Sequence, residues 1–234
     1  MLSVMSSNGS HTPAIAFFDV DNTLVRGSTM YQLAKTAWRA GHIHVADVAR
    51  FAWHQLMFLL VGETPGQMRT ARGRGLALIA GQPAAGIRAI AETAFVRGIR
   101  PRLMEQTVAR AKAHMEHGDE VWIVTASPQD LGAIIARELG LTGALGTVVE
   151  ERGGIATGRL VGEPLHGPLK VVAIRRLAAE RGIDLADCSA YSDSINDLPM
   201  LSAVGHPVAV NPDAALRRHA RAAGWDIVGE RKKR

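Results

Sequence analysis

The chain lacks the residues that stabilise secreted or membrane-spanning proteins. It has 234 residues and a single cysteine, Cys188, so it cannot form an internal disulfide bond. A lone thiol fits a reducing compartment, and we expect a cytoplasmic protein. Long apolar runs are also missing, because the most apolar stretch, FAWHQLMFLLV at 51–61, contains polar residues and is too short to cross a bilayer. We expect no membrane span.

Lysine is scarce, whereas arginine is abundant. The 27 basic residues comprise 5 lysines and 22 arginines, and the net charge is +5. This excess suits an anionic ligand but does not distinguish a phosphate ester from a nucleic acid or an acidic lipid. The densest basic cluster, RKKR at 231–234, has no aromatic residues interleaved with it. We therefore expect a solvated tail and no nucleic-acid partner.

The apolar pattern predicts an α/β fold. AIAFF at 14–18 is a continuous apolar run that ends at an aspartate, which is typical of a buried parallel strand. Further strands are predicted at 121–124, 188–192 and 206–210, with helices between them. Ser127, Pro128 and Asp130 fit the N-cap, first and third positions of the helix that follows 121–124. This alternation predicts a doubly wound, Rossmann-like parallel sheet that binds ligands beyond the carboxyl ends of its strands.

Two changes of pattern indicate an insertion in this core. Between 28 and 103 apolar residues recur at helical spacings of three and four, and no strand pattern interrupts them. Residues 147–161 have the pattern of a hairpin that turns at Gly153 and Gly154. The predicted parts are a flexible extension (1–13), a core domain (14–27 and 104–230), a helical insert (28–103) and a basic tail (231–234).

Two aspartates, Asp19 and Asp21, follow the first predicted strand directly. In an extended chain, side chains two positions apart point the same way, so both carboxylates would face one site. Adjacent carboxylates raise each other's proton affinity unless a cation lies between them. The pair therefore indicates a bound metal, an acid and a base, or both. The spacing alone is equally compatible with a turn or a helix cap.

The longer string around the pair, FFDVDNTL at 17–24, resembles the first motif of the haloacid dehalogenase superfamily. The resemblance implies that Asp19 attacks phosphorus and forms an aspartyl phosphate. It also implies that Asp21 protonates the leaving oxygen and later helps to activate water. A carboxylate at the second position favours a phosphatase over a dehalogenase of the same superfamily, because a halide leaving group needs no proton.

Later segments resemble the other superfamily motifs, in the same order. Thr125 resembles the hydroxyl residue of the second motif, which hydrogen-bonds a phosphoryl oxygen, and the Ala126 amide is a further candidate donor. Lys170, in GPLK, matches the lysine that stabilises phosphoryl charge and holds the nucleophile. The string YSDSINDLPML at 191–201 resembles the fourth motif, which is GDGxND in the phosphoserine phosphatase branch.

The fourth motif also implies a metal site. Its expected ligand is Asp193, together with Asp19 and the carbonyl oxygen of Asp21. Hard oxygen ligands beside a phosphate suit Mg²⁺. Asn196 and Asp197 are expected to support these ligands from behind.

The helical insert resembles the small cap of the phosphoserine phosphatase-like branch, which closes over the substrate. One position departs from that branch: Ser28 stands where a glutamate contacts the substrate amino group. Arg69, Arg72 and Arg74 are candidates for holding a substrate carboxylate, although a solvated helix face explains at least two of them. The stretch 51–61 either lines a pocket for a hydrophobic ester or packs between cap helices.

The sequence therefore predicts a Mg²⁺-dependent phosphomonoesterase, similar to phosphoserine phosphatase, that acts on a small phosphorylated metabolite. The first alternative is a phosphatase for another ester, of the lysophospholipid or glycerol phosphate type. The second is a phosphate-binding regulatory module with little turnover. A phosphotransferase is the third, because an aspartyl phosphate can pass to acceptors other than water. Neither the ester nor the oligomeric state follows from the sequence.

Overall fold

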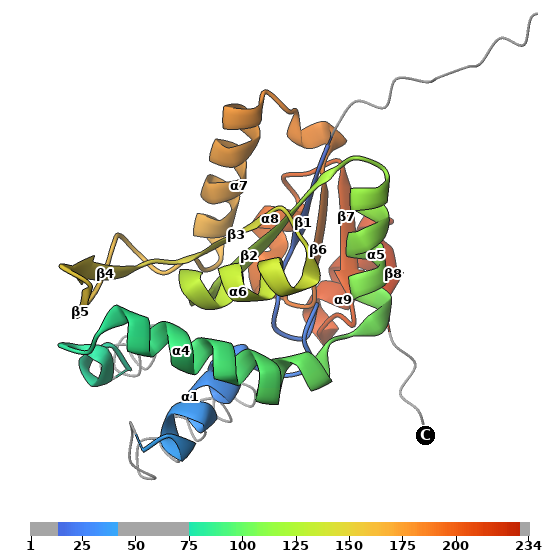
Figure 1. Ribbon diagram of the computed structural model, residues 1–234. Helices are drawn as coiled ribbons and strands as arrows, with labels where there is room; N and C mark the ends of the chain where they lie inside the picture. Colours follow the sequence, from blue (N-terminus) through green and yellow to red (C-terminus); the bar gives the residue numbers. More distant parts are fainter. Residues whose placement is uncertain (1–13, 42–74, 230–234) are drawn as a thin grey trace, which may run out of the picture.

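The computed structural model describes residues 14–41 and 75–229, and its centre is a six-stranded sheet (Figure 1). The strand order is β3-β2-β1-β6-β7-β8, and all neighbours pair in parallel. Because the order reverses between β1 and β6, the sheet is doubly wound, as predicted. The strands are β1 (Ile15–Phe18), β2 (Glu120–Pro128), β3 (Gly143–Thr147), β6 (Ser189–Ser192), β7 (His206–Val210) and β8 (Asp226–Val228).

Helices cover both faces of the sheet (Figure 1). Every side chain of β1 is buried, which explains why this strand is a continuous apolar run rather than an alternating one. Phe17 and Phe18 are neighbours in the chain but belong to different apolar clusters, because successive side chains of a strand point to opposite faces. The covering helices are α5 (Glu105–Glu116), α6 (Gln129–Leu139), α7 (Pro168–Arg181), α8 (Leu198–Leu201) and α9 (Ala214–Ala223).

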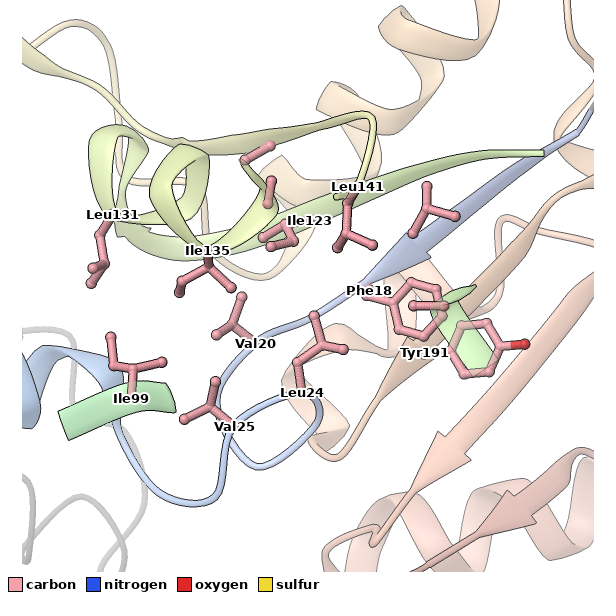
Figure 2. Packing of buried hydrophobic residues seen from close by; sticks show 14 of the residues in the cluster. Phe18, Val20, Leu24, Val25, Ile99, Ile123, Leu131, Ile135, Leu141 and Tyr191 are labelled. Carbon is pink, nitrogen blue, oxygen red and sulfur yellow. The ribbon is translucent and has the colours of Figure 1, made fainter. Parts of the chain in front are cut away.

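One of the two clusters lies under α5 and α6 and extends beyond the sheet (Figure 2). It combines Phe18 of β1 and Ile135 of α6 with Val25, which lies just before the helical segment that follows β1, and with Ile99, which lies within that segment. The second cluster lies under α7, α8 and α9 and includes Phe17 and Cys188. The first cluster therefore packs the core against the segment that the sequence predicts as an insert.

The described parts of that segment are helical and lie beside one end of the sheet (Figure 1). The chain leaves and re-enters the core at one place, where the Arg26 amide donates to the Arg102 carbonyl over 2.8 Å. The Met104 amide likewise donates to the Leu24 carbonyl over 2.9 Å. The elements are α1 (Thr29–Arg39), α4 (Ala84–Ala94), the π-helix η1 (Phe95–Ile99) and the 3₁₀ turn η2 (Arg100–Arg102).

A two-stranded hairpin, β4 (Val149–Arg152) and β5 (Ile155–Leu160), follows β3. It turns at Gly153 and Gly154, as predicted, and both glycines have positive φ angles, of 57° and 78°. A two-residue hairpin turn of this kind requires such backbone, which glycine adopts without strain.

This hairpin is attached by backbone hydrogen bonds to the residues just before α4. The Gly81 amide donates to the Ala156 carbonyl over 2.8 Å, and the Ala156 amide donates to the Gln82 carbonyl over 3.0 Å. The Ala84 amide donates to the Gly154 carbonyl over 2.8 Å. The hairpin thus joins the helical segment to the core at a second place.

Several details differ from the expectations. The sequence pattern places a helix N-cap at Ser127, whereas β2 continues to Pro128 and α6 begins at Gln129. The pattern also misses β3 and β8. The sequence of β3, GALGT, contains two glycines, and glycine is depleted in strands.

No helix within the described ranges is long and apolar enough to cross a membrane. The predictions for 1–13, 51–61, Arg69, Arg72, Arg74 and the tail 231–234 lie outside the described residues.

Candidate active site

Three neighbouring strands place polar side chains at one edge of the sheet. Asp19 follows the end of β1, Asp193 follows the end of β6, and Thr125 lies in the last part of β2. Since β2, β1 and β6 are adjacent and parallel, these ends lie side by side at the point where the strand order reverses. This is where open α/β sheets bind their ligands.

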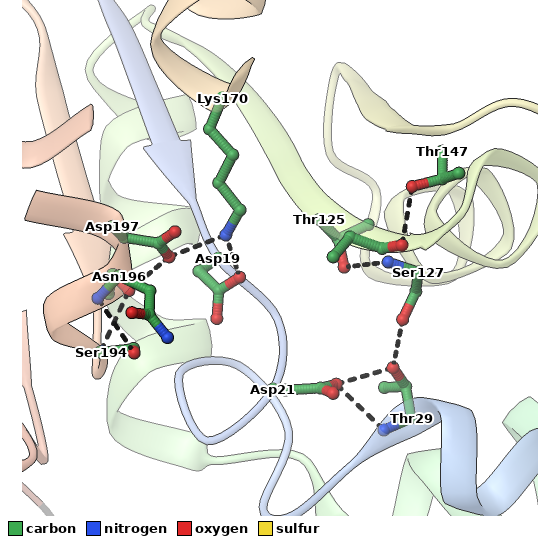
Figure 3. Close-up of polar contacts among 12 residues, drawn as sticks. Asp19, Asp21, Thr29, Thr125, Ser127, Thr147, Lys170, Ser194, Asn196 and Asp197 are labelled. Atoms are coloured by element: carbon green, nitrogen blue, oxygen red, sulfur yellow. Dashed lines mark hydrogen bonds and ion pairs between the residues drawn. The ribbon is translucent and has the colours of Figure 1, made fainter. Parts of the chain in front are cut away.

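Lys170 enters the same place from the first turn of α7 (Figure 3). Its Nζ lies 2.6 Å from Oδ1 of Asp19 and 2.7 Å from Oδ2 of Asp197. The hydroxyl of Ser192 donates to the same oxygen of Asp197 over 2.7 Å. Only 3% of the Lys170 side chain is exposed, so its charge depends on these two carboxylates.

The buried lysine stays charged. Burial by itself lowers the pKa of Lys170, but the charges and hydrogen bonds of Asp19 and Asp197 outweigh it and raise that pKa above its ordinary value. A permanent ammonium group therefore lies against the carboxylate of Asp19.

When fully ionised, the carboxyl groups of the site would carry more negative charge than Lys170 neutralises. Burial raises the pKa of Asp19 to about 7, with Lys170 lowering it and Asp197 raising it. Burial also raises the pKa of Asp193 to about 8, and the charges of Asp19 and Asp197 add to the effect. Together with Asp21 there are four carboxyl groups here, and one ammonium offsets only one of their charges.

This donor set fits a hard divalent cation. Carboxylate and carbonyl oxygens are the ligands that Mg²⁺ prefers, and a divalent charge would offset the burial and the smaller repulsion that raise these pKa values. The described residues hold no ready-made cluster of three or more His, Cys, Asp or Glu side chains around a metal position. The expected ligand set needs only two carboxylates, from Asp19 and Asp193, plus the backbone carbonyl of Asp21.

Asp21 is held apart from this lysine-centred group by hydrogen bonds to the start of α1 (Figure 3). Its Oδ1 accepts from the Thr29 amide over 2.9 Å and from the Thr29 hydroxyl over 2.6 Å. Burial raises the pKa of Asp21, while hydrogen bonds from Thr29 and Ser28 oppose the rise. A carboxyl group whose pKa is raised by burial holds a proton more readily than an exposed one, which suits it to give up and take back a proton.

The second-motif residues lie in the last part of β2, where its pairing register with β3 shifts. The hydroxyl oxygen of Thr125 accepts from the Ser127 amide over 3.1 Å, and only 3% of Thr125 is exposed. The Ala126 carbonyl accepts from the Thr147 hydroxyl over 2.7 Å. These bonds hold the part of β2 that contains the expected phosphate donors, Thr125 and the Ala126 amide.

The fourth motif makes a short 3₁₀ turn, η4 (Ile195–Asp197), after β6. Ser194 caps this turn by accepting from the Asn196 amide over 3.3 Å. The Asp193 carbonyl, just before the turn, accepts from the Asp213 amide over 2.8 Å. Asp197, at the end of the turn, is 3% exposed and faces Lys170. The turn therefore places Asp197 against Lys170, which also contacts Asp19.

The structure gives Ser28 a role that its position in the sequence did not suggest. Ser28 is the N-cap of α1, where its hydroxyl accepts from the Tyr31 amide over 3.3 Å. Sequence reasoning also missed Thr29, Ser127 and Ser192. Of these, only Ser192 could have been recognised from the sequence, because a polar residue in a short buried strand beside a motif needs a hydrogen-bond partner.

Comparison with known families agrees with this geometry. The model of a family described as haloacid dehalogenase-like hydrolase matches residues 16–202. The chain belongs to this family. A protein of Mycobacterium tuberculosis strain H37Rv named phosphoserine phosphatase SerB1 is 46% identical over 215 residues, covering 92% of this chain and 70% of the relative. The chain is accordingly a hydrolase of the phosphatase type, as the sequence predicts.

Solved structures show the same fold. A protein of unknown function from Bordetella pertussis Tohama I is 34% identical and superposes with a TM-score of 0.82, covering 93% of this hydrolase and 99% of its own chain. A substrate-bound phosphoserine phosphatase complex superposes with a TM-score of 0.68 at 20% identity, covering 94% and 95%. At that identity the second likeness concerns the fold alone.

Proposed function

We propose that this hydrolase is a Mg²⁺-dependent phosphomonoesterase that cleaves a small phosphorylated metabolite through an aspartyl-phosphate intermediate. The contact of Lys170 with both Asp19 and Asp197 carries the proposal. It holds the carboxylate that would attack, and it places a permanent positive charge where a phosphate would bind. The relative named phosphoserine phosphatase supports the choice of reaction.

In the first step, an oxygen of Asp19 attacks phosphorus and the bond between phosphorus and the ester oxygen breaks. The proton of Asp21 passes to the leaving alkoxide, which departs as an alcohol. In the second step, water attacks the phosphorus of the aspartyl phosphate, the bond between phosphorus and the Asp19 oxygen breaks, and Asp21 takes up a proton of the water. Inorganic phosphate leaves, and both carboxyl groups return to their starting states.

The other residues of the site bind and orient the phosphate. The hydroxyl of Thr125 and the amide of Ala126 are proposed donors to its oxygens, with the Lys170 ammonium opposite them. Asp19, Asp193 and the Asp21 carbonyl would hold Mg²⁺, with Asn196 and Asp197 supporting them. When bound, the cation supplies charge that lets an anionic nucleophile approach an anionic phosphate.

We further propose that residues 28–103 form a cap over this site and that 14–27 and 104–230 form the core. The hydrogen bonds between the chain segments at Arg26 and Arg102 mark the boundary. A cytoplasmic setting remains our expectation, supported by the single cysteine.

Phosphoserine itself is not favoured over other phosphate esters. Ser28 caps α1, and a hydroxyl in that role supplies no negative charge for a substrate amino group. The candidate arginines Arg69, Arg72 and Arg74 bear on this question, but they lie outside the described residues. A turnover screen across phosphoserine, glycerol phosphates, lysophosphatidate, sugar phosphates and nucleotides would identify the ester.

Two substitutions test the proposed chemistry. Asp19→Asn should lower kcat for an aryl phosphate in Mg²⁺ by on the order of 10³-fold or more, because the amide cannot attack phosphorus. Asp21→Asn should slow alkyl esters more than aryl esters, whose leaving groups need less protonation. Steady-state kinetics would measure both effects. Asp226→Asn, in the edge strand β8, is the control and should leave kcat unchanged. Normal turnover in the Asp19→Asn protein would refute the proposal.

A further inference from the structure

The carboxylate of Asp21 is bound by both hydrogen-bond donors of one residue. The Thr29 amide and the Thr29 hydroxyl donate to the same oxygen, Oδ1, over 2.9 and 2.6 Å. Thr29 is fully buried, so its hydroxyl does not share this bond with bulk water. Two donors on one oxygen fix the plane and direction of the carboxyl group, since a single hydrogen bond leaves it free to rotate.

The hydroxyl of Thr29 has a second partner that sets the direction of the bonds. Its oxygen lies 2.9 Å from the hydroxyl oxygen of Ser127, and the contact is buried. A hydroxyl has only one proton to donate, and a carboxylate can only accept. Thr29 therefore donates to Asp21, and Ser127 donates to Thr29 (Figure 3). The series of hydrogen bonds continues to Thr125, whose hydroxyl oxygen accepts from the Ser127 amide.

Helix capping does not account for this arrangement. The N-cap of α1 is Ser28, whose hydroxyl already accepts from the Tyr31 amide. Within the described part of the chain, the hydroxyl of Thr29 contacts Asp21 and Ser127 and makes no bond to the backbone of its own helix. Its geometry is thus specific to the acid and to the end of β2.

We infer that Thr29 is a positioning residue for Asp21 and that the proton exchanged with the leaving group resides on Oδ2, the oxygen that Thr29 does not hold. The inference rests on the proposed function, because it assigns a helper to the proposed acid. Thr29 is also the first residue of α1, so the start of the proposed cap and the orientation of the acid are tied together. Ser127 extends the same link to the end of β2, which would bind phosphate.

Thr29→Val tests this role, because valine keeps the shape and the amide but loses the hydroxyl. We expect kcat/KM for an alkyl phosphate, which reports only the steps up to release of the alcohol, to fall by about 10- to 100-fold, a part of the 10²- to 10⁴-fold that a general acid contributes. For a nitrophenyl phosphate, whose leaving group needs little protonation, the loss of kcat/KM should stay below about 3-fold, although kcat can fall for both esters because Asp21 also acts in the second step. Thr29→Ser keeps both donors and should restore the alkyl ester to within about 3-fold of the wild type.

Thr36→Val is the matched control in the same helix. The hydroxyl of Thr36 donates to the Gln32 carbonyl and does not touch Asp21, so both esters should be hydrolysed at wild-type rates. Ser127→Ala removes the donor to Thr29 but leaves the bonds to Asp21. It should give a smaller loss that is again confined to the alkyl ester, and it serves as the test if Thr29→Val does not fold.

Equal losses of kcat/KM on the two esters in Thr29→Val and Ser127→Ala would overturn the inference alone, because they would indicate a purely structural role. The same applies if Thr29→Ser fails to restore the alkyl ester. An inactive wild-type protein, or full activity in Asp19→Asn, would instead overturn the proposed function and the inference with it. The two failures are therefore distinguishable within one set of assays.

Discussion

At the scale of single residues, Lys170 combines a structural and a chemical role. Asp19 and Asp197 hold the buried ammonium of Lys170, so removing this ammonium leaves two buried carboxylates without a cation. Removing one partner of a buried ion pair costs about 3–5 kcal/mol. We therefore expect Lys170→Met to lower the free energy of unfolding by about that amount at pH 8, measured by urea denaturation, and to abolish turnover.

A double variant separates the two roles of Lys170. Lys170→Met with Asp197→Asn removes one of the orphaned charges, so most of the stability should return while the protein stays inactive. If the double variant is no more stable than Lys170→Met, the ion pair with Asp197 is not what stabilises this part of the core.

Metal binding should depend on pH because protons and Mg²⁺ compete for the same carboxyl groups. The pKa values of Asp19 and Asp193 are raised to about 7 and about 8. A raised pKa means that the folded, metal-free protein binds these protons more tightly than the unfolded chain does. The stability that results is fully present below the ordinary pKa of the carboxyl groups. That contribution is lost as the pH rises through 7 to 8. At higher pH, Mg²⁺ replaces the protons as the neutralising charge.

We therefore expect Mg²⁺ to raise Tm more at about pH 8.5 than at about pH 6. At a concentration near 100 times its Kd, a ligand stabilises the fold by about 2.7 kcal/mol. Calorimetry with and without chelator measures the shift, and Asp193→Asn should remove most of it. An equal shift at both pH values would show that Mg²⁺ does not bind at these carboxyl groups.

At the scale of elements, the hairpin of β4 and β5 meets the helical segment through a glycine. Gly158 has a φ angle of +77°, and a Cβ atom there would lie 2.7 Å from the Cβ of Ala80 and 3.1 Å from the Leu76 carbonyl oxygen. Both the backbone conformation and the close approach require glycine. This contact lies beside the backbone bonds that attach the hairpin to Gly81 and Ala84.

Gly158→Val should therefore destabilise the protein by about 1–3 kcal/mol and loosen this junction. Hydrogen exchange should speed up at the amides of Gly81, Ala84 and Ala156. Gly162→Val is a matched control, because Gly162 has a φ angle of +76° but a Cβ atom there would meet no described atom within 4 Å. If both variants exchange alike, backbone strain rather than crowding is responsible.

At the scale of the whole molecule, two kinds of contact join the helical segment to the core. Phe95 is 1% exposed and belongs to the apolar cluster that includes Leu131 and Ile135 of α6. On the surface above it, Arg137 of α6 pairs with Glu92 of α4 over 2.9 Å, and both side chains are well exposed. Apolar burial should dominate, since exposed ion pairs contribute only about 0–1 kcal/mol.

Paired substitutions test this ranking. Phe95→Ala should lower the free energy of unfolding by about 3–5 kcal/mol, because it leaves a cavity in the first cluster. Arg137→Gln should lower it by less than about 1 kcal/mol, and less still at high salt. Denaturant titration of both variants provides the comparison. A larger effect from Arg137→Gln would mean that charge, rather than packing, holds the segment in place.

How well the sequence predicts a feature of this molecule depends on how far apart the interacting residues lie along the chain. The strands β1, β6 and β7 were predicted within one residue, because a buried parallel strand is a local apolar run. β3 was missed, because its glycines pack against other elements: a Cβ at Gly143 would lie 2.6 Å from the Trp122 ring. Ser127 was misread as a helix cap, because its partner, Thr29, is 98 positions away.

The sequence by itself determined the doubly wound sheet and which chemical groups lie at the ends of its strands. Asp19, Thr125 and Asp193 meet because parallel strands bring their carboxyl ends to one edge, and apolar periodicity reveals the strands. The family resemblance implied that Lys170 holds the nucleophile Asp19, but only the tertiary structure decided how Asp21 is held by Thr29 and that Lys170 also contacts Asp197. The contact between Thr29 and Ser127 joins residues 98 positions apart. Such contacts depend on the packing of whole elements, which no local pattern encodes.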